Sequence, residues 1–147
     1  MIIQILAAIV GTIAFSLLFG VPRQYYALCG MIGGIGWAVY VLSEMHFSEV
    51  IAVLIATMIV ILLSRVAAVA RKCPVTLFLI PGIFPLVPGA RVYWTTYYMV
   101  TDQLRKAAET GYTAVKIAVA IVLGIVFVFE IPQSFFMKIL QWKSSDK

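Results

Sequence analysis

Long apolar runs separated by short polar gaps dominate the chain. The five apolar segments cover residues 2–20, 25–43, 50–70, 75–101 and 113–130. A membrane-spanning helix needs about 20 mostly apolar residues. The pattern therefore predicts an all-α integral membrane protein with about five transmembrane helices, in one transmembrane domain over residues 1–147. The remaining segment, residues 133–147, alternates aromatic residues with lysines and is expected to form an amphipathic tail at the membrane surface.

Composition supports this prediction. Of the 147 residues, 63% are hydrophobic and only 12% are charged, and the mean hydropathy is +1.06. A soluble domain of this size has too much surface to bury so large an apolar share. The net charge of +5 is interpreted as orienting the helices against an anionic leaflet, so no nucleic-acid partner is expected.

The gaps between the segments carry an uneven distribution of charge. Arg23 lies in the first gap and Arg71 and Lys72 lie in the third, whereas the second gap is acidic. The positive-inside rule then predicts an external amino terminus and, with five crossings, a cytoplasmic carboxyl terminus. The basic residues of gap 102–112 would lie outside, which disagrees with the rule. A re-entrant fourth segment would move them inside, but five crossings are preferred.

The second apolar segment carries a stripe of small residues. Gly30 and Gly34 form a G-x-x-x-G pair, and Gly33 and Gly36 lie beside them. Small residues at this spacing let two helix backbones approach closely in lipid. We interpret the stripe as a helix-packing face, with a substrate-lining role as the alternative.

The fourth apolar segment is interrupted at membrane depth. The interrupting residues are Pro81, Gly82, Pro85, Pro88 and Gly89. Each proline removes a backbone donor and disfavours helix at the residue before it. Unwound backbone inside a membrane persists only where protein or a watery cavity surrounds it. The segment therefore predicts a broken helix of the kind that transporters use, with a simple kink beside an interfacial aromatic belt as the alternative.

Candidate binding residues follow the break. A half-helix starting at Pro88–Gly89 would present the amides of about residues 90–92, and Arg91 would add a guanidinium that binds carboxylates. Thr95 and Tyr98 share the helical face of Arg91, and Tyr93 is adjacent. We expect Arg91, Tyr93, Thr95 and Tyr98 to bind a substrate.

Residue patterns typical of enzymes are missing from the sequence. The single histidine, His46, lies in an acidic gap, and the apolar segments contain no cluster of carboxylates. Cys29 and Cys73 have neither the spacing of a metal pair nor that of a disulfide framework. We expect no enzymatic activity, no bound metal and no cofactor.

The interrupted segment also carries a family resemblance. Its Pro85-x-x-Pro88-Gly89-x-x-x-Tyr93 pattern resembles that of the small, YjjB-like subunits of the threonine/serine exporter (ThrE) family. Two further motifs agree in position, namely Phe19-Gly20-Val21-Pro22 and the glycine-rich helix with Gly33 and Gly36-Trp37. The resemblance implies half of an exporter in the bacterial inner (plasma) membrane, working with a larger ThrE-domain membrane subunit in a hetero-oligomer.

The sequence leaves two functions open. The first is a secondary-exporter subunit for small polar metabolites, either threonine/serine-type amino acids or dicarboxylates such as succinate, which some pairs of this family are associated with. Both substrate classes stay open because a helix terminus with one arginine accepts any carboxylate. The alternative is a membrane scaffold or assembly subunit that transports nothing.

Overall fold

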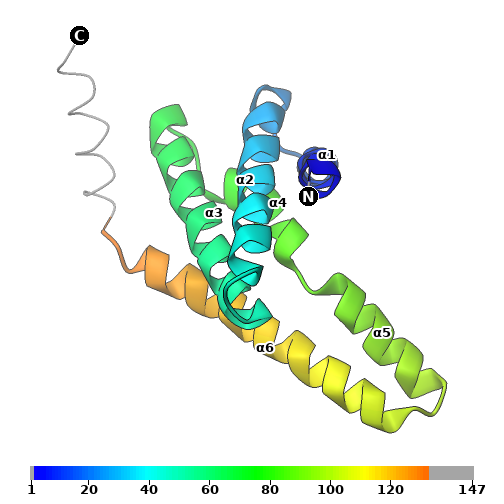
Figure 1. Cartoon of the computed structure of the whole chain (residues 1–147). Coiled ribbons are helices and arrows are strands. Elements are labelled where there is room, and N and C mark those ends of the chain that lie inside the picture. Colours follow the sequence, from blue (N-terminus) through cyan, green and yellow to red (C-terminus); the bar gives the residue numbers. More distant parts are fainter. Residues whose placement is uncertain (1, 133–147) are drawn as a thin grey trace.

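The computed structural model describes residues 2–132, and all regular structure among them is helical (Figure 1). The elements in chain order are α1 (Ile2–Leu18), η1 (Arg23–Tyr25), α2 (Tyr26–Glu44), α3 (Glu49–Arg71), α4 (Thr76–Ile83), η2 (Phe84–Leu86), α5 (Gly89–Val100) and α6 (Leu104–Phe129). The expected amphipathic tail, residues 133–147, lies outside the described residues.

The predicted all-α membrane fold is confirmed, but the number of spans is approximate. Three helices within residues 2–132 are long and apolar enough to cross a membrane: η1 with α2, α3, and α6. The α4–η2 segment and α5 together make a fourth candidate, bent by 48° at the break. Helix α1 is apolar but has only 17 residues, and it crosses α2 steeply in Figure 1. The five expected spans therefore correspond to three or four long candidates and this shorter helix.

Glycines bring α1 and α2 into close contact. A Cβ atom added to Gly33 would lie only 2.1 Å from Oγ1 of Thr12, and one added to Gly34 would lie 2.4 Å from Cγ1 of Ile9. Gly30 is similarly close to Ile13. The hydroxyl of the buried Thr12 donates to the Ala8 carbonyl at 2.7 Å, so this contact surface leaves that polar group satisfied. Backbone contact is thus possible here because the glycines have no side chains.

Helix α3 occupies the centre of the molecule. It packs against α2, α4 and α6, and Gly36 of α2 faces its Val60. Val53 clusters with Ile117 of α6, whereas Ile61, two turns later, clusters with Val128. Contacts therefore advance in the same order along both helices. Helices α3 and α6 thus run in the same direction, although their axes cross obliquely (Figure 1).

The molecule consequently has two chemically different ends. Residues near the start of α2 meet the end of α3 and the start of α4, where the rings of Tyr25 and Phe78 lie 5.4 Å apart. We call this the basic end, because Arg23, Arg71 and Lys72 lie there. The opposite end carries the loop between α2 and α3, with Glu44 before it and Glu49 after it, and is called the acidic end.

Helix α6 begins earlier than the sequence predicts. The expected polar gap 102–112 shrinks to a short turn, and α6 starts at Leu104 rather than near residue 113. Residues 104–109 are strong helix formers, and Arg105 pairs with Glu109 one turn later at 3.2 Å. Gly111, which falls within the expected gap, lies inside α6 against Thr95 of α5. The predicted start near residue 113 is therefore wrong, because it rests on the charged residues of the gap alone.

Helix α5 packs mainly against the first half of α6, and none of its residues is buried. Figure 1 shows this α5–α6 hairpin projecting away from the other helices. The break before α5 lies where the hairpin meets the acidic end, and the candidate site lies there too.

Candidate functional site

The break between α4 and α5 is short and well defined. Pro81 and Gly82 are buried in the last turns of α4, Pro85 lies in η2, and Val87 is extended. Helix α5 then starts at Gly89 with Pro88 as its N-cap residue. Prolines thus terminate one helix and start the next, as their fixed φ and missing N–H require.

One expectation about this break needs correction. The amide of Val92 donates to the Pro88 carbonyl at 3.1 Å, so it is not one of the exposed helix-terminal donors expected over residues 90–92. Gly89 has no positive φ, and a Cβ added to it would meet nothing within 4 Å. Close backbone packing instead occurs at Gly82, where an added Cβ would lie 3.0 Å from Ile32.

A cleft of about 430 Å³ lies beside the break. Its walls come from α2, the first turns of α3, the broken segment and one residue of α6. The lining residues are Trp37, Tyr40, Glu49, Val53, Pro85, Leu86, Val87, Pro88, Gly89, Ala90, Arg91, Trp94 and Ile117. The volume is in the range of small-molecule sites.

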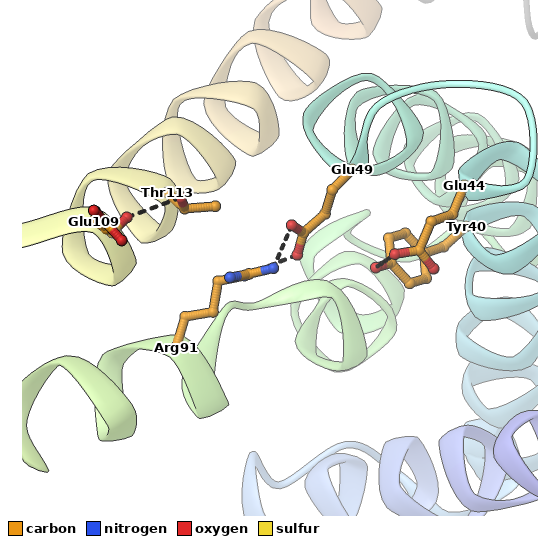
Figure 2. A network of polar contacts seen from close by, with 6 residues as sticks. All are labelled: Tyr40, Glu44, Glu49, Arg91, Glu109 and Thr113. Carbon is orange, nitrogen blue, oxygen red and sulfur yellow. Dashed lines mark hydrogen bonds and ion pairs between the residues drawn. The ribbon is translucent and has the colours of Figure 1, made fainter. Parts of the chain in front are cut away.

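The charged residues of the cleft form a two-point ion pair. Nε of Arg91 donates to Oε1 of Glu49 at 2.9 Å, and Nη2 donates to Oε2 of the same carboxylate. Figure 2 shows Arg91 reaching from α5 across to Glu49 at the start of α3. The side chains are 38% and 26% exposed. This geometry is the bidentate arrangement in which arginine recognises a carboxylate.

Aromatic side chains of α2 and α5 complete the cleft. The Tyr40 hydroxyl donates to Oε1 of Glu44 at 2.9 Å, as Figure 2 shows. The ring centroids of Tyr40 and Trp37 lie 5.1 Å apart. The Trp37 Nε1 is buried and has no hydrogen-bond partner among residues 2–132. Trp94 contributes a further ring from α5.

Only one of the four predicted substrate-binding residues lines the cleft, namely Arg91. The Thr95 hydroxyl donates to the Arg91 carbonyl at 2.7 Å, and its methyl group faces Gly111. The Tyr98 ring lies 5.6 Å from the ammonium of Lys106, and Tyr93 is 63% exposed. The hairpin explains this outcome, because α5 turns the face of Thr95 and Tyr98 toward α6.

Sequence reasoning missed the four other charged, polar or aromatic residues of the cleft: Trp37, Tyr40, Glu49 and Trp94. Glu49 is the single acidic residue in the first turn of α3, and the sequence indicates only a polar gap there. Trp37 and Tyr40 are three residues apart and therefore share a face of α2, which is a signal that sequence inspection can use. The pairing with Arg91 depends on the direction of α5 after the break.

Comparison with known protein families identifies the family of the chain. A family model described as "Threonine/Serine exporter, ThrE" matches residues 4–131. This chain belongs to the ThrE family. The matched region of this ThrE-family protein runs from α1 to just beyond α6 and includes the whole cleft. A search of curated proteins and a search of solved structures each found no match.

The cleft of this ThrE-family protein has features that suit it to binding a small charged molecule. It offers one cation, one carboxylate and aromatic walls. Among residues 2–132, no group of three histidine, cysteine or acidic residues is placed to hold a metal ion. A small molecule that carries both charges would find a partner for each of them here.

Proposed function

We propose that this chain is a subunit of a secondary exporter that moves threonine/serine-type amino acids out across the bacterial inner membrane. Membership of a transporter family supports the transport role. The observation that carries the substrate class is the Arg91–Glu49 ion pair in the cleft. The charges of an amino acid are a carboxylate and an ammonium, and this pair is complementary to both.

When the substrate binds, it separates Arg91 from Glu49 and pairs with each of them. Its carboxylate binds the Arg91 guanidinium, and its ammonium binds the Glu49 carboxylate. One internal ion pair is thereby exchanged for two equivalent ones, so no charge is left unpaired in the cleft.

A dicarboxylate fits this cleft less well. Succinate carries two negative charges, and binding at Arg91 would leave the Glu49 carboxylate beside them without a cation. The repulsion between these like charges opposes binding. Amino acids are therefore the preferred class, and succinate is the second substrate to be measured.

We also propose a larger ThrE-domain membrane subunit as the partner in a hetero-oligomer. Helix α5 supports this proposal, because none of its residues is buried and it exposes Tyr93, Trp94 and Tyr97. A partner that covers this face would also enclose the cleft, which lies at the amino-terminal end of α5. Transport is accordingly expected only when both subunits are present.

Efflux measurements test the function directly. Cells that make this chain together with its larger partner are loaded with labelled threonine, serine or succinate, and export is followed in wild type, Arg91→Gln and Glu49→Gln. Each variant removes one charged hydrogen-bonding partner, worth about 1.5–3 kcal/mol. We expect threonine and serine export to fall by about tenfold or more.

The matched control is Arg105→Gln. Arg105 also forms an ion pair with a glutamate, Glu109, but both side chains are largely exposed on α6 away from the cleft. Export should stay at the wild-type rate in this variant. Wild-type rates in all three variants at normal membrane levels would contradict the proposal and favour the scaffold role. Export of succinate alone would overturn the substrate class.

A further inference from the structure

The cleft beside the break, called the Arg91 cleft from here on, has a charged entrance and an apolar inner wall. The side chains of Arg91 and Glu49 are 38% and 26% exposed. Three further lining residues, Val53, Leu86 and Ile117, are only 3%, 5% and 2% exposed. The ion pair therefore lies nearer the surface of the molecule, and the three apolar side chains lie deeper in the cleft.

The packing of the helices explains this order. Glu49 and Val53 are one turn apart in α3 and share one face of that helix. Val53 packs against Ile117 of α6, and Tyr40 of α2 packs against the same cluster. The inner wall is thus part of the close-packed core, so several helices together fix its shape.

An amino acid bound as proposed above uses both of its charges at the entrance of the Arg91 cleft. Its carboxylate pairs with Arg91 and its ammonium pairs with Glu49. The side chain is then the part of the substrate that remains to contact the inner wall. The wall therefore selects among amino acids by their side chains.

The inner wall is poorly suited to recognising a hydroxyl group. Nε1 of Trp37 is enclosed by protein, and the Tyr40 hydroxyl already donates its proton to Glu44. The other lining side chains with polar atoms are the partly or well exposed Glu49, Arg91 and Trp94. Valine has the shape of threonine, with a methyl group in place of the hydroxyl. An apolar pocket distinguishes such a pair only weakly, and the difference favours the apolar member.

Given the proposed function, on which this inference rests, we propose that the Arg91 cleft also takes L-valine as a substrate for export. Val53 and Ile117 are the residues that select a small branched side chain. Threonine binds no better than valine, because its hydroxyl loses water on entering the inner wall. Serine binds less well than threonine, since it lacks a methyl group, and one buried methyl group corresponds to about fourfold in binding.

Efflux of three labelled amino acids tests the proposal. Cells that make this chain together with its larger partner are loaded with valine, threonine or serine, and export by cells without this chain is subtracted. Wild type should export valine at least as efficiently as threonine, and threonine about fourfold more efficiently than serine. Arg91→Gln should lower valine and threonine export by the same factor, because both amino acids use the same guanidinium.

Variants of the inner wall test the selecting residues. Val53→Ala enlarges the cleft, so the ratio of leucine export to valine export should rise about fourfold, the factor for one accommodated CH₂ group. Ile117→Val removes one CH₂ group from the wall and should raise the ratio in the same direction. This ratio is measured within one variant, so it does not depend on how much protein reaches the membrane.

The matched control is Val122→Ala. Val122 is 56% exposed on α6 and does not line the Arg91 cleft. The same chemical change at this position should leave the ratio of leucine export to valine export at the wild-type value. A rise equal to that of Val53→Ala would contradict the role of the inner wall.

A failure of this inference is distinguishable from a failure of the proposed function. Threonine export with valine rejected by about 100-fold or more would overturn the inference and leave the proposed function standing, because such a site binds the hydroxyl directly. An unchanged ratio in both Val53→Ala and Ile117→Val would also overturn the inference. If wild type exports none of these amino acids, the proposed function is wrong and the inference fails with it.

Discussion

Two buried polar atoms within residues 2–132 have no hydrogen-bond partner: the indole Nε1 of Trp37 and the Thr57 hydroxyl. Thr57 lies between α3 and α6, where a Cβ added to Gly124 would be 2.9 Å from its methyl group. Trp37 lines the Arg91 cleft. An unsatisfied buried donor is destabilising by about 1–3 kcal/mol. At Trp37 the donor is enclosed by protein although other atoms of the residue line the cleft.

The prediction at this scale is Trp37→Phe, which removes the N–H and keeps an aromatic ring. We expect the free energy of unfolding in detergent, measured by thermal denaturation, to stay level or rise by up to about 1–3 kcal/mol, because the loss of an unpartnered buried donor offsets the packing lost with the smaller ring. Trp94→Phe is the control, since Trp94 also lines the cleft but its indole is not a buried, unpartnered donor. Equal changes in the two variants would contradict the role of the indole.

The sequence reveals some residues of the candidate site but not others. Arg91 is identifiable from the sequence because it lies three residues after Pro88, at the start of the second half-helix. Glu49 is not, since its partner lies 42 residues further along the chain. Thr95 was assigned to the site from its one-turn spacing to Arg91. That spacing is real, but the Thr95 hydroxyl is bonded within its own helix, and helical periodicity gives no information about which neighbour a face meets.

At the scale of the element, the contact between α1 and α2 is the tightest glycine packing described. Gly33, Gly30 and Gly34 face α1, whereas Gly11 of α1 has open space around its Cβ position. The two helices therefore depend on glycine on one side only. This asymmetry makes the packing contribution of a single glycine measurable.

The second prediction is Gly33→Ala, which places a methyl group 2.1 Å from Oγ1 of Thr12 and forces the helices apart. We expect the free energy of unfolding in detergent to fall by about 1–3 kcal/mol, the usual effect of overpacking. Gly11→Ala should leave stability unchanged or raise it by up to about 1 kcal/mol through helix propensity. Thermal denaturation followed by circular dichroism measures both. A stable Gly33→Ala protein would show that α1 is free to shift.

Elements were more predictable than their ends. The long apolar runs fixed α2 and α3 to within a few residues, and the prolines located the break. The start of α6 was misplaced because residues 104–109 are polar yet strongly helix-forming, and a hydropathy profile responds only to the first property. The status of α1 as a span also depends on its crossing of α2, which no single segment reveals.

At the scale of the whole molecule, α2 separates two ends of opposite character. Gln24 is exposed at the basic end, and His46 is exposed in the acidic loop at the other. If the positive-inside rule holds for this chain, the basic end faces the cytoplasm. The parallel sense of α3 and α6 then directs the end of α6 to the same side, in agreement with the predicted cytoplasmic carboxyl terminus.

The third prediction tests this orientation with two single cysteines, Gln24→Cys and His46→Cys, in a Cys73→Ser background. The remaining Cys29 is fully buried. An impermeant thiol reagent added to intact cells should label position 46 and leave position 24 unlabelled until the membrane is opened. The opposite pattern would reverse the orientation of the molecule.

The α3–α6 contact can form only late in the synthesis of the chain. Contacts between α1 and α2, between α2 and α3, and between those helices and α4 join segments that leave the ribosome first. The partner of α3 on its remaining side, α6, is synthesised last. Chains fold from the amino terminus as they emerge, so the Thr57 face of α3 stays uncovered during synthesis. We expect a ribosome stalled before α6 to hold a nascent chain that a membrane chaperone protects at that face.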